Sequence, residues 1–517
     1  MHLYCPVCGK DYPLDTRELC CPEGSEDGVH PLIKREDADE LSRVFPAVLT
    51  KRWNDGKLSF SVFREFMASY QLANANGKAS WWLERVLALS NACERLAGRG
   101  FIRTPEIQAD DLAEAIDLPK GSLFVKNETL QLMGSHKSRH LAGAIMHLET
   151  LREISDKPDE KKTLAIFSCG NAAMGAAAIA GAAGYRLYTF VPDHVSETVV
   201  AILTNLGANV VKVSREGTVG EGDPCNLRYQ EALKKFGWVP FTSYGHDIWS
   251  AVEGAETLQY EFLFNQYLLD APLDVMVVQV GGGGLANAVI TANALFKRLG
   301  VIRSLPRFYT CQTASCYPLA QSYFMILREL GREGVVTLSP ELAMALEGSF
   351  DAKVLLENHL GQIKMTANLI CEMYPKIAED LEKVFVKVGQ NRSEYFRPWA
   401  QNVPESVAEG ILDDTTYDGL EVIRGMIESG GLPLIADEPS LEKAHELARQ
   451  HTGIDLSATG SAGLAGLRLL VKNNLVRKGE RCGLLFTGVG ERKCDLPVVR
   501  DRVFTLSAGD NIRKLVD

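Results

Sequence analysis

The sequence predicts an α/β protein built on mainly parallel sheets, and three observations support this fold class. From Gly121 onward, short apolar runs alternate with helical stretches. Several of these runs end in loops rich in glycine or small polar residues. Hydrophobic residues make up 46% and charged residues 23% of the 517 positions, which is the composition of an ordinary globular protein. Alternating strands and helices are typical of a parallel sheet covered by helices on both faces.

The strands are expected at seven apolar runs, which are separated by amphipathic or alanine-rich segments. Two of these segments, His140–Ile154 and Ala172–Ala183, predict helices. Residues 30–100 are expected to be helical and connective, with Trp81 and Trp82 packing on the main body. The runs that predict strands are Ser122–Lys126, Thr163–Phe167, Arg186–Val191, Ala208–Val213, Val275–Val280, Arg307–Cys311 and Cys482–Phe486.

Composition also excludes several classes of partner. A formal net charge of −11 argues against a surface that coats nucleic acid. The uncharged stretch Leu164–Tyr185 is too rich in alanine and glycine for a membrane-spanning helix, so no membrane segment is expected. Most of the 12 cysteines are scattered singly, and the first residues lack a signal-peptide pattern. We therefore expect a cytoplasmic protein.

The N-terminal segment stands apart because four cysteines gather there. Cys5 and Cys8 form a CxxC turn followed by glycine, in which two thiolates can share one zinc ion. Cys20 and Cys21 are expected to supply the other two ligands. The alternative is a surface loop of free thiols, because adjacent cysteines rarely ligate one metal without strain.

A run of four glycines follows the expected strand Val275–Val280. The backbone amides of Gly281–Gly284 can approach an anion closely, and a helix begins directly behind them. This pattern predicts a phosphate site. A nucleotide is disfavoured, because the next strand ends without an acidic residue and a Walker-type lysine is missing. A small phosphate-bearing cofactor fits better.

Three further loops carry polar residues at the ends of strands or the starts of helices. Lys137 follows a Gly-Ser turn at a predicted helix start, where the helix dipole favours the neutral amine that an imine-forming nucleophile requires. Ser168–Ala172 closes a strand and opens a helix, so its amides can hold an anion. Thr487 ends the last strand beside Gly488. Taken singly, these residues also fit a solvated lysine, an asparagine helix cap and a strand-to-turn junction.

Taken together and in this order, the four loops resemble the fold-type II pyridoxal-phosphate enzymes, the tryptophan synthase β-like fold. The likeness runs from about Arg103 to Lys493. Several motifs are most similar to the threonine synthase branch, whose relatives include threonine dehydratase and the tryptophan synthase β subunit. These motifs are Glu253-Gly254-Ala255-Glu256-Thr257, Asp413-Asp414-Thr415-Thr416-Tyr417-Asp418, Ser457-Ala458-Thr459-Gly460-Ser461-Ala462 and the N-terminal cysteine knuckle. Lys126-Asn127-Glu128 and Gly134-Ser135-His136-Lys137 are similar to the lysine segment of the whole family, and the Ser-His-Lys part is nearest the tryptophan synthase form.

The resemblance implies a role for each matching residue. Lys137 would form the imine link to pyridoxal 5'-phosphate, Asn171 would bond the oxygen on the pyridine ring, and Thr487 would meet the pyridine nitrogen. The cofactor phosphate would be held by Gly281, Gly282, Gly283, Gly284 and Leu285. The substrate carboxylate would be held by Ser168, Cys169, Gly170, Asn171 and Ala172.

The resemblance also implies a domain organisation. The cysteine-rich segment would cover residues 1–24 and a helical extension residues 25–102. A large cofactor-binding domain would combine residues 103–159 and 271–517, and a small α/β domain would cover residues 160–270. Cofactor and substrate would lie between the two domains, and a homodimer is the usual arrangement of the family.

Two departures from the family pattern leave the substrate open. Cys169 stands where a small hydroxyl residue is usual, and His136 precedes the lysine where threonine synthases have phenylalanine. The function expected is elimination or replacement at the β or γ carbon of an amino acid, as in threonine synthase. The alternative is a catalytically silent protein that acts as a binding or regulatory module. A nicotinamide oxidoreductase is a distant third reading.

Overall fold

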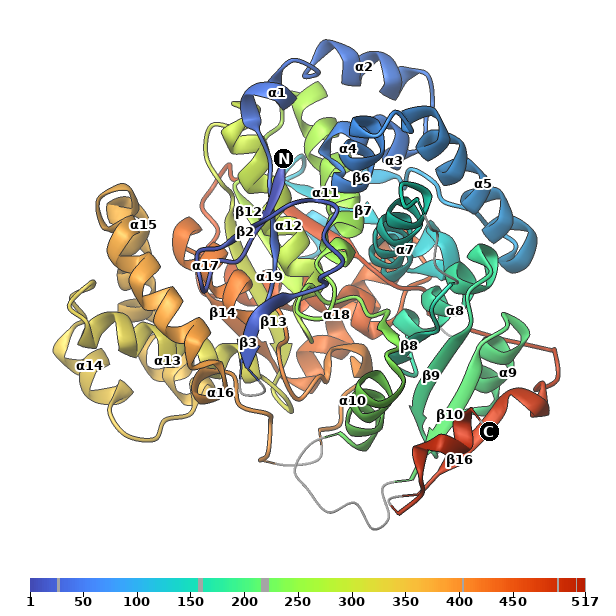
Figure 1. Ribbon diagram of the computed structural model, residues 1–517. Coiled ribbons are helices and arrows are strands. Elements are labelled where there is room, and N and C mark those ends of the chain that lie inside the picture. The colour runs from blue at the N-terminus through green and yellow to red at the C-terminus, as the bar shows by residue number, and fades with distance from the viewer. Residues whose placement is uncertain are drawn as a thin grey trace.

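A computed structural model describes residues 1–25, 28–156, 161–214, 223–401, 404–490, 492–507 and 509–516 of the chain. Two sheets organise the main body (Figure 1). The larger sheet has six strands in the order β14 (Pro433–Ala436), β13 (Arg307–Thr313), β12 (Val275–Gln279), β15 (Cys482–Phe486), β7 (Leu123–Asn127) and β6 (Glu106–Gln108). The smaller sheet has five strands in the order β11 (Val239–Pro240), β8 (Leu164–Phe167), β9 (Leu187–Pro192), β10 (Asn209–Val213) and β16 (Val503–Leu506).

Both sheets are mainly parallel, which confirms the predicted fold class. In the larger sheet only the edge strand β6 runs antiparallel to its neighbour. In the smaller sheet every neighbouring pair of strands is parallel. All seven apolar runs that predicted strands form strands, because central strands of a parallel sheet are buried on both faces.

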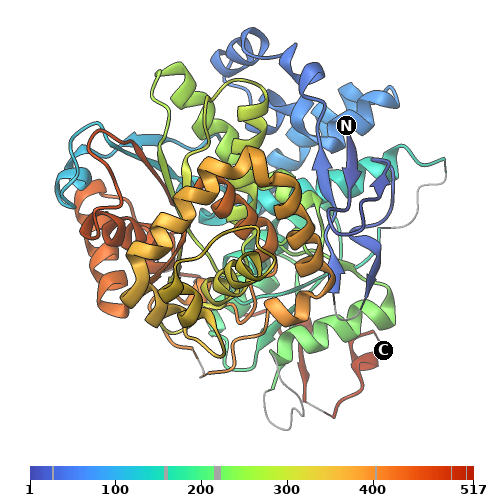
Figure 2. The ribbon, with the colours of Figure 1, turned by 90° about the vertical axis from the view of Figure 1, so that its left-hand side faces the viewer.

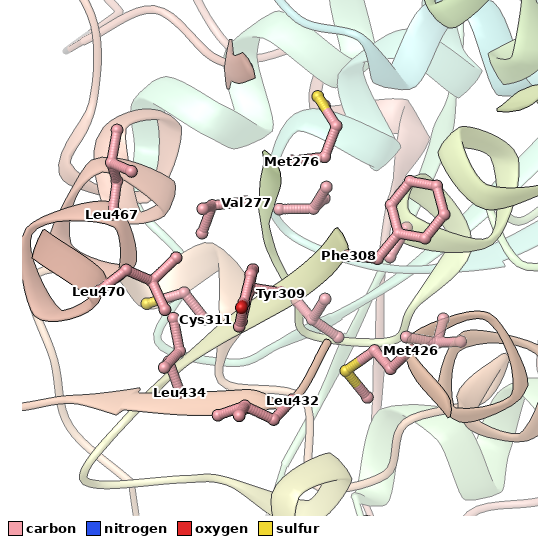
Figure 3. Packing of buried hydrophobic residues seen from close by; sticks show 14 of the residues in the cluster. Met276, Val277, Phe308, Tyr309, Cys311, Met426, Leu432, Leu434, Leu467 and Leu470 are labelled. Carbon is pink, nitrogen blue, oxygen red and sulfur yellow. The ribbon is translucent and has the colours of Figure 1, made fainter. Parts of the chain in front are cut away.

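The six-stranded sheet is covered by helices on both faces. On one face, α19 (Ala458–Lys472) contacts β12, β13, β14 and β15, while α17 (Gly419–Ser429) packs on β13 from the other side. Figure 3 shows Leu467 and Leu470 of α19 beside Cys311, with Met426 of α17 near Phe308. The helix α19 lies close to the sheet because a side chain is missing at position 466. A Cβ on Gly466 would lie 3.0 Å from that of Cys311.

The five-stranded sheet divides its side chains between two helical layers by strict alternation. Leu164 and Ile166 of β8 belong to the cluster formed with α8 (Asn171–Ala183). The intervening Ala165 belongs instead to the cluster formed with α10 (Pro224–Phe236). Successive residues of a strand point to opposite faces, so this alternation places α8 and α10 on opposite faces of the sheet.

Two long helices cross between the sheets. The helices α7 (Lys137–Glu153) and α11 (Ser250–Leu268) are in backbone contact where Gly143 meets Gly254. A Cβ on Gly254 would lie 2.1 Å from the carbonyl oxygen of Arg139. The Glu-Gly-x-x-Thr motif therefore has a structural reason for its glycine: the crossing has no room for a side chain.

The N-terminal 102 residues wrap along one side of the molecule (Figure 2). Trp82 is fully buried, as expected, whereas Trp81 is partly exposed and packs against the same cluster. The strands here are β1 (His2–Tyr4), β2 (Asp11–Tyr12), β3 (Cys21–Ser25), β4 (Gly28–His30) and β5 (Ile33–Arg35). The helices are α1 (Ala38–Ser42), α2 (Ala47–Asn54), α3 (Ser59–Val62), α4 (Ala68–Ala75) and α5 (Ala79–Ala97).

The C-terminal segment departs from the domain boundaries expected from the sequence. Residues 271–517 were assigned to the large domain, but β16 pairs with β10 at the edge of the smaller sheet. The strand β16 has only four residues, so its pattern of apolar and polar side chains is too short to indicate which sheet it joins. The remaining boundaries stay predictions. Among the described residues, no helix is long and apolar enough to cross a membrane.

The other helices complete the layers. The longest, α15 (Ala352–Gln390), contains Pro375 and leaves helical geometry at His359. The rest are α6 (Asp110–Glu114), α9 (Glu197–Asn205), α12 (Gly284–Arg298), α13 (Pro318–Arg332), α14 (Pro340–Leu346), α16 (Arg392–Tyr395) and α18 (Glu438–Thr452).

Candidate active site

The loop before Lys137 is positioned by a close contact with the end of β15. Two short 3-10 turns, Glu128–Leu130 and Leu132–Gly134, lead from β7 to the start of α7. Gly134 has a φ of 63°, a conformation that favours glycine. A Cβ there would lie 2.7 Å from Cγ1 of Val489, so the two loops can approach only through a glycine.

Backbone hydrogen bonds fix this lysine loop to the Thr487 loop. The amide of His136 donates to the carbonyl oxygen of Thr487 over 3.2 Å, and the amide of Val489 donates to that of Gly134 over 2.9 Å. Since β7 and β15 are neighbours in the sheet, both loops emerge from the same edge. Lys137 and Thr487 therefore lie together although 350 positions separate them in the sequence.

The amine of Lys137 is held in a buried setting. Its Nζ donates to Oγ of Ser243 over 2.8 Å. Burial lowers the pKa of Lys137, and the charges of Asp413 and Asp418 oppose that effect in part. A lowered pKa enlarges the fraction of neutral amine, the form that attacks a carbonyl carbon. The cause of the shift is burial, whereas the sequence suggested the dipole of the helix that Lys137 begins.

His136, the residue before the lysine, is neutral. Burial lowers the pKa of His136 to about 3, and the neighbouring charge of Lys137 acts in the same direction. Its Nδ1 lies 3.2 Å from the carbonyl oxygen of Thr487. A carbonyl oxygen only accepts hydrogen bonds, so Nδ1 carries the hydrogen. His136 therefore contributes a third link between the two loops.

The four-glycine loop forms a cradle that side chains would fill. It joins β12 to the N-terminus of α12, and Gly283 has a φ of 95°. A Cβ on Gly282 would lie 2.2 Å from Cε1 of Tyr244, and one on Gly284 would lie 2.1 Å from the carbonyl oxygen of Ser243. Bare backbone amides at the start of a helix are well suited to a phosphate group.

The loop Ser168–Ala172 reaches the same cavity from the smaller sheet. Asn171 begins α8, and Oγ of Ser168 accepts a hydrogen bond from the amide of Gly170 over 3.2 Å. Cys169 is an exposed free thiol. Oδ1 of Asn171 is buried and has no hydrogen-bond partner within the described ranges. A buried unpaired oxygen indicates room for a ligand that completes its bonding.

These loops surround one cavity of about 340 Å³. The sequence-based candidates for cofactor and substrate contact all line it, although they come from both sheets. They are Lys137, Ser168, Cys169, Gly170, Asn171, Ala172, Gly281, Gly282, Gly283, Gly284, Leu285 and Thr487. The structure brings these residues together, and their individual roles remain proposals.

Sequence reasoning gave no role to several other lining residues. Tyr244 donates from its hydroxyl to Oδ1 of Asp413 over 3.2 Å, and its ring lies 4.7 Å from that of Tyr417. Glu409 and Gln279 also line the cavity. The only sequence signal for Gln279 was a polar residue in an otherwise apolar strand. Tyr244 follows the two-residue strand β11, which carries no recognisable pattern.

The acidic pair beside Tyr244 is shifted toward its protonated form. Burial raises the pKa of Asp413, and the charge of Lys137 and the hydrogen bond from Tyr244 oppose this in part. Burial, followed by the charge of Asp413, raises the pKa of Asp414 to about 6. Both shifts favour the protonated form, and Asp413 itself lines the cavity.

The cysteine cluster forms, but with a different fourth member. Ligand atoms of Cys5, Cys8, Cys21 and His30 all lie within 4.8 Å of one another. Cys20, expected as a ligand, does not belong to this group. Neighbouring residues of an extended chain point in opposite directions, so Cys20 and Cys21 cannot both face the cluster. The cysteine spacing does not indicate His30, because this residue reaches the cluster only through the pairing of β3 with β4.

The residues of the main cavity fit pyridoxal phosphate. The glycine cradle suits its phosphate, the unpaired Asn171 oxygen marks an unsatisfied polar position in the cavity, and Lys137 presents the required amine. Thr487, 2% exposed, offers a hydroxyl at the end of β15.

Comparison with known proteins agrees with this fit. Residues 98–367, just over half of the chain, match the family model described as pyridoxal-phosphate dependent enzyme. Serine dehydratase-like proteins of Rattus norvegicus and Homo sapiens are 31% and 32% identical over 188 residues. Each match covers 36% of this chain and 50% of the relative. A catabolic L-threonine dehydratase of Staphylococcus aureus is 28% identical over 190 residues, which cover 37% of this chain and 49% of the relative.

Solved structures show the same fold at low sequence identity. The diaminopropionate ammonia lyase of Escherichia coli superposes with a TM-score of 0.51 at 14% identity and covers 78% of this chain and 88% of its own. Maize serine racemase superposes with a TM-score of 0.50 at 15% identity and covers 79% and 94%. The chain spans about half the length of the curated relatives. The cavity, the fold and the family match lead to one conclusion: this chain belongs to the pyridoxal-phosphate dependent enzymes, in the fold-type II class.

Proposed function

We propose that this protein is a lyase or transferase that eliminates or replaces a leaving group at the β or γ carbon of an amino acid. One observation carries the proposal. A single cavity joins an amine of lowered pKa, a glycine cradle for phosphate and a neutral hydroxyl, Thr487, at the strand end. Bound pyridoxal phosphate supplies an electron sink for the charge left at Cα when its proton departs.

The neutral hydroxyl of Thr487 favours elimination over transamination. An aspartate at this position would pair with a protonated pyridine nitrogen and strengthen the electron sink, whereas a hydroxyl offers no negative charge. With a weaker sink, expulsion of a leaving group soon after loss of the Cα proton is favoured over chemistry that needs a long-lived carbanion. The end of β15 therefore selects the type of reaction.

Lys137 is the base in this proposal. Substrate binding frees its amine, and Nζ accepts the Cα proton as the Cα–H bond breaks. Ser243 holds Nζ within 2.8 Å, so the amine has a fixed resting position. The amides of the Ser168–Ala172 loop would bind the substrate carboxylate and orient the Cα–H bond toward Lys137.

Asp413 is placed to assist the leaving group. Its raised pKa lets the carboxyl carry a proton, and Tyr244 keeps it oriented toward the cavity. In the elimination step the bond from carbon to the leaving atom breaks, and the departing hydroxyl or phosphate takes that proton. The electron pair of the broken Cα–H bond forms the new carbon–carbon double bond.

Two finer assignments compete within this class. The motifs Glu253–Thr257 and Asp413–Asp418 favour a reaction like that of threonine synthase. The curated relatives are named as serine and threonine dehydratase-like proteins, which favours deamination of a hydroxy amino acid. The silent alternative has no support from the site, because a scaffold has no use for a buried lysine of lowered pKa.

A substrate panel tests the proposal. Purified full-length protein loaded with pyridoxal phosphate would receive serine, threonine, O-phosphoserine, O-phosphohomoserine and 2,3-diaminopropionate. We expect release of water, phosphate or ammonia together with a 2-oxo acid or a substituted amino acid. Measuring 2-oxo acid and phosphate separately tells dehydratase from threonine synthase-like activity. Transfer of amino groups between 2-oxo acids at a comparable rate would contradict the argument from Thr487.

A further inference from the structure

The cysteine cluster at the N-terminus has the geometry of a metal site. Sγ of Cys8 lies 3.6 Å from Sγ of Cys21, and the amide of Cys8 donates to Sγ of Cys5 over 3.4 Å. Tetrahedral zinc with zinc–sulfur bonds of about 2.3 Å holds two sulfurs about 3.8 Å apart. The sulfur spacing is therefore close to that of ligands around one zinc ion.

A second observation points to a ligand, namely an unpaired histidine. Cys21 and His30 face each other across the antiparallel pair β3–β4. Nδ1 of His30 is buried and, within the described part of the chain, has no hydrogen-bond partner. A buried imidazole nitrogen beside three thiols is what a Cys₃His zinc site needs for its fourth bond.

We propose that Cys5, Cys8, Cys21 and His30 bind one structural zinc ion. Four protein ligands close a tetrahedral shell, so the site holds its metal without offering a position to substrate. The cluster packs against Trp249, whose amide donates to the carbonyl oxygen of Leu19 over 3.4 Å.

Through Trp249, the proposed zinc site is linked to the segment that carries Ser243. Trp249 immediately precedes α11 and follows Ser243, the partner of Lys137, by six residues. Zinc would therefore fix the N-terminal strands against the segment that leads from Ser243 into α11. This inference does not depend on the proposed reaction.

Metal analysis of full-length variants tests the ligand set. We expect one zinc per chain in the native protein and in Cys20→Ser, the matched control. His30→Ala should lose bound zinc to a chromophoric chelator and should unfold at a lower temperature. His30→Cys should recover zinc binding, which separates loss of a ligand from misfolding. Zinc loss in Cys20→Ser with retention in His30→Ala, or a native protein that neither contains zinc nor binds added zinc, would overturn the proposal.

A separate observation concerns the residue behind Thr487. Nε2 of Gln279 donates to Oγ1 of Thr487 over 2.9 Å, and the carbonyl oxygens of Leu485 and Gly460 lie 3.1 and 3.2 Å from the same nitrogen. Two carbonyl oxygens at this distance require a donor, so the amide cannot be flipped. Gln279 is 4% exposed.

We infer that Gln279 is a positioning residue that turns Thr487 into a hydrogen-bond donor. The two hydrogens on Nε2 of Gln279 are shared among three acceptors, and this nitrogen cannot accept in return, so the hydroxyl hydrogen of Thr487 does not point at it. The hydroxyl hydrogen is then free to donate into the cavity. If the cofactor binds as proposed, this hydrogen bonds to the pyridine nitrogen and keeps that nitrogen unprotonated.

The protonation state of the pyridine nitrogen tests this inference without relying on turnover. Protein loaded with ¹⁵N-labelled pyridoxal phosphate should show the nitrogen chemical shift of a neutral pyridine. In Gln279→Glu the carboxyl can accept from Thr487, which should reverse the hydroxyl and move the shift toward that of a protonated ring. Gln312→Leu, a buried glutamine of the neighbouring strand β13, is the control and should leave the shift unchanged.

The outcomes separate this inference from the proposed function. A native protein that does not bind the cofactor would refute the proposed function itself. A native protein that binds it with a protonated pyridine nitrogen, or a Gln279→Glu variant whose shift does not move, would refute the role of Gln279 alone.

Discussion

At the scale of single residues, the site depends on side chains whose protonation is set by burial. Lys137 has a lowered pKa, whereas Asp413 and Asp414 have raised ones. All three shifts favour the neutral form, because a charge loses solvation when water is excluded. Burial thus enlarges the share of neutral amine at Lys137 and of protonated carboxyl at Asp413, and groups shifted in this way suit acid–base chemistry.

The first prediction concerns Lys137. Lys137→Ala should abolish the borohydride-reducible bond to the cofactor and reduce turnover by at least about 10³-fold, since both nucleophile and base are removed. The fold should persist, because the side chain of Lys137 lies in the cavity at the start of α7 and not in the hydrophobic core. Peptide mapping by mass spectrometry locates the reduced bond. Lys120→Ala, at an exposed lysine, is the control. Reduction that traps the cofactor on another lysine would refute the assignment.

The second prediction concerns Asp414, whose pKa is raised to about 6. A carboxyl group with a raised folded-state pKa binds its proton more tightly in the folded state, so its contribution to stability falls as pH rises from about 4 to 6. In Asp414→Asn the side chain stays neutral, so the stability that the native protein loses as pH rises is retained. The variant should be more stable than the native protein by about 1–2 kcal/mol at pH 8. Urea unfolding at several pH values measures the difference, which should vanish at pH 4.

At the scale of secondary structure elements, the crossing of α7 and α11 sets the position of Lys137. Lys137 opens α7, and Arg139, two residues further on, forms buried ion pairs with Glu128 and Glu261. The pairing anchors the first turn of α7 to α11. Loss of either the close crossing or the ion pairs would therefore move Lys137 relative to the cavity.

The third prediction tests this crossing. In Gly254→Ala the new Cβ would meet the carbonyl oxygen of Arg139 at 2.1 Å, so the helices must separate. We expect a loss of stability of about 1–3 kcal/mol or more, together with weaker cofactor binding. The control is Gly361→Ala in α15, where nothing lies within 4 Å of the new Cβ. Thermal unfolding and cofactor titration compare them. Equal effects would show that the crossing tolerates a side chain.

The strands and the loops around the cavity were predictable from the sequence because their signals are local. An apolar run ending in four glycines, or a lysine after a Gly-Ser turn, needs no knowledge of distant residues. Ser243, Gln279 and His30 were not predictable in this way. Their roles depend on contacts with Lys137, Thr487 and three cysteines that only the folded chain brings near. The position of the edge strand β16 was not predictable for the same reason, since its pairing with β10 joins segments about 290 residues apart.

At the scale of the whole molecule, the N-terminal segment is bound to the main body by a buried charge cluster. Nζ of Lys34 lies 2.7 Å from Glu256 and 3.7 Å from Glu253, both on α11, and 3.5 Å from Glu36. Burial raises the pKa of Glu253 to about 7, and Lys34 opposes that rise. The lysine thus holds together carboxylates that would otherwise repel one another.

The fourth prediction follows from this cluster. Lys34→Met should destabilise the protein by about 3–5 kcal/mol, because buried carboxylates lose their counter-charge. Lys443→Met removes an exposed lysine paired with Glu446 and should cost less than about 1 kcal/mol. Urea unfolding midpoints give the comparison. A similar small change in both variants would mean that the cluster does not hold the N-terminal segment in place.

The fifth prediction is the homodimer that the family resemblance suggests. Light scattering of the purified protein should give twice the chain mass of 56.8 kDa. The mass should stay constant on dilution through the micromolar range. A mass equal to one chain at all concentrations would contradict it.

The two sheets supply different loops of the cavity, and this separation bears on how the substrate of such an enzyme can change. The lysine, the glycine cradle and Thr487 all come from the six-stranded sheet, and backbone bonds tie the lysine loop to the Thr487 loop. The loop Ser168–Ala172 comes from the five-stranded sheet. If that loop binds the substrate carboxylate as proposed, substitutions at Ser168 or Cys169 would change which amino acid binds while the glycine loop of the larger sheet stays the same. Under the proposed function, a change of substrate would therefore require changes at the edge of one sheet alone.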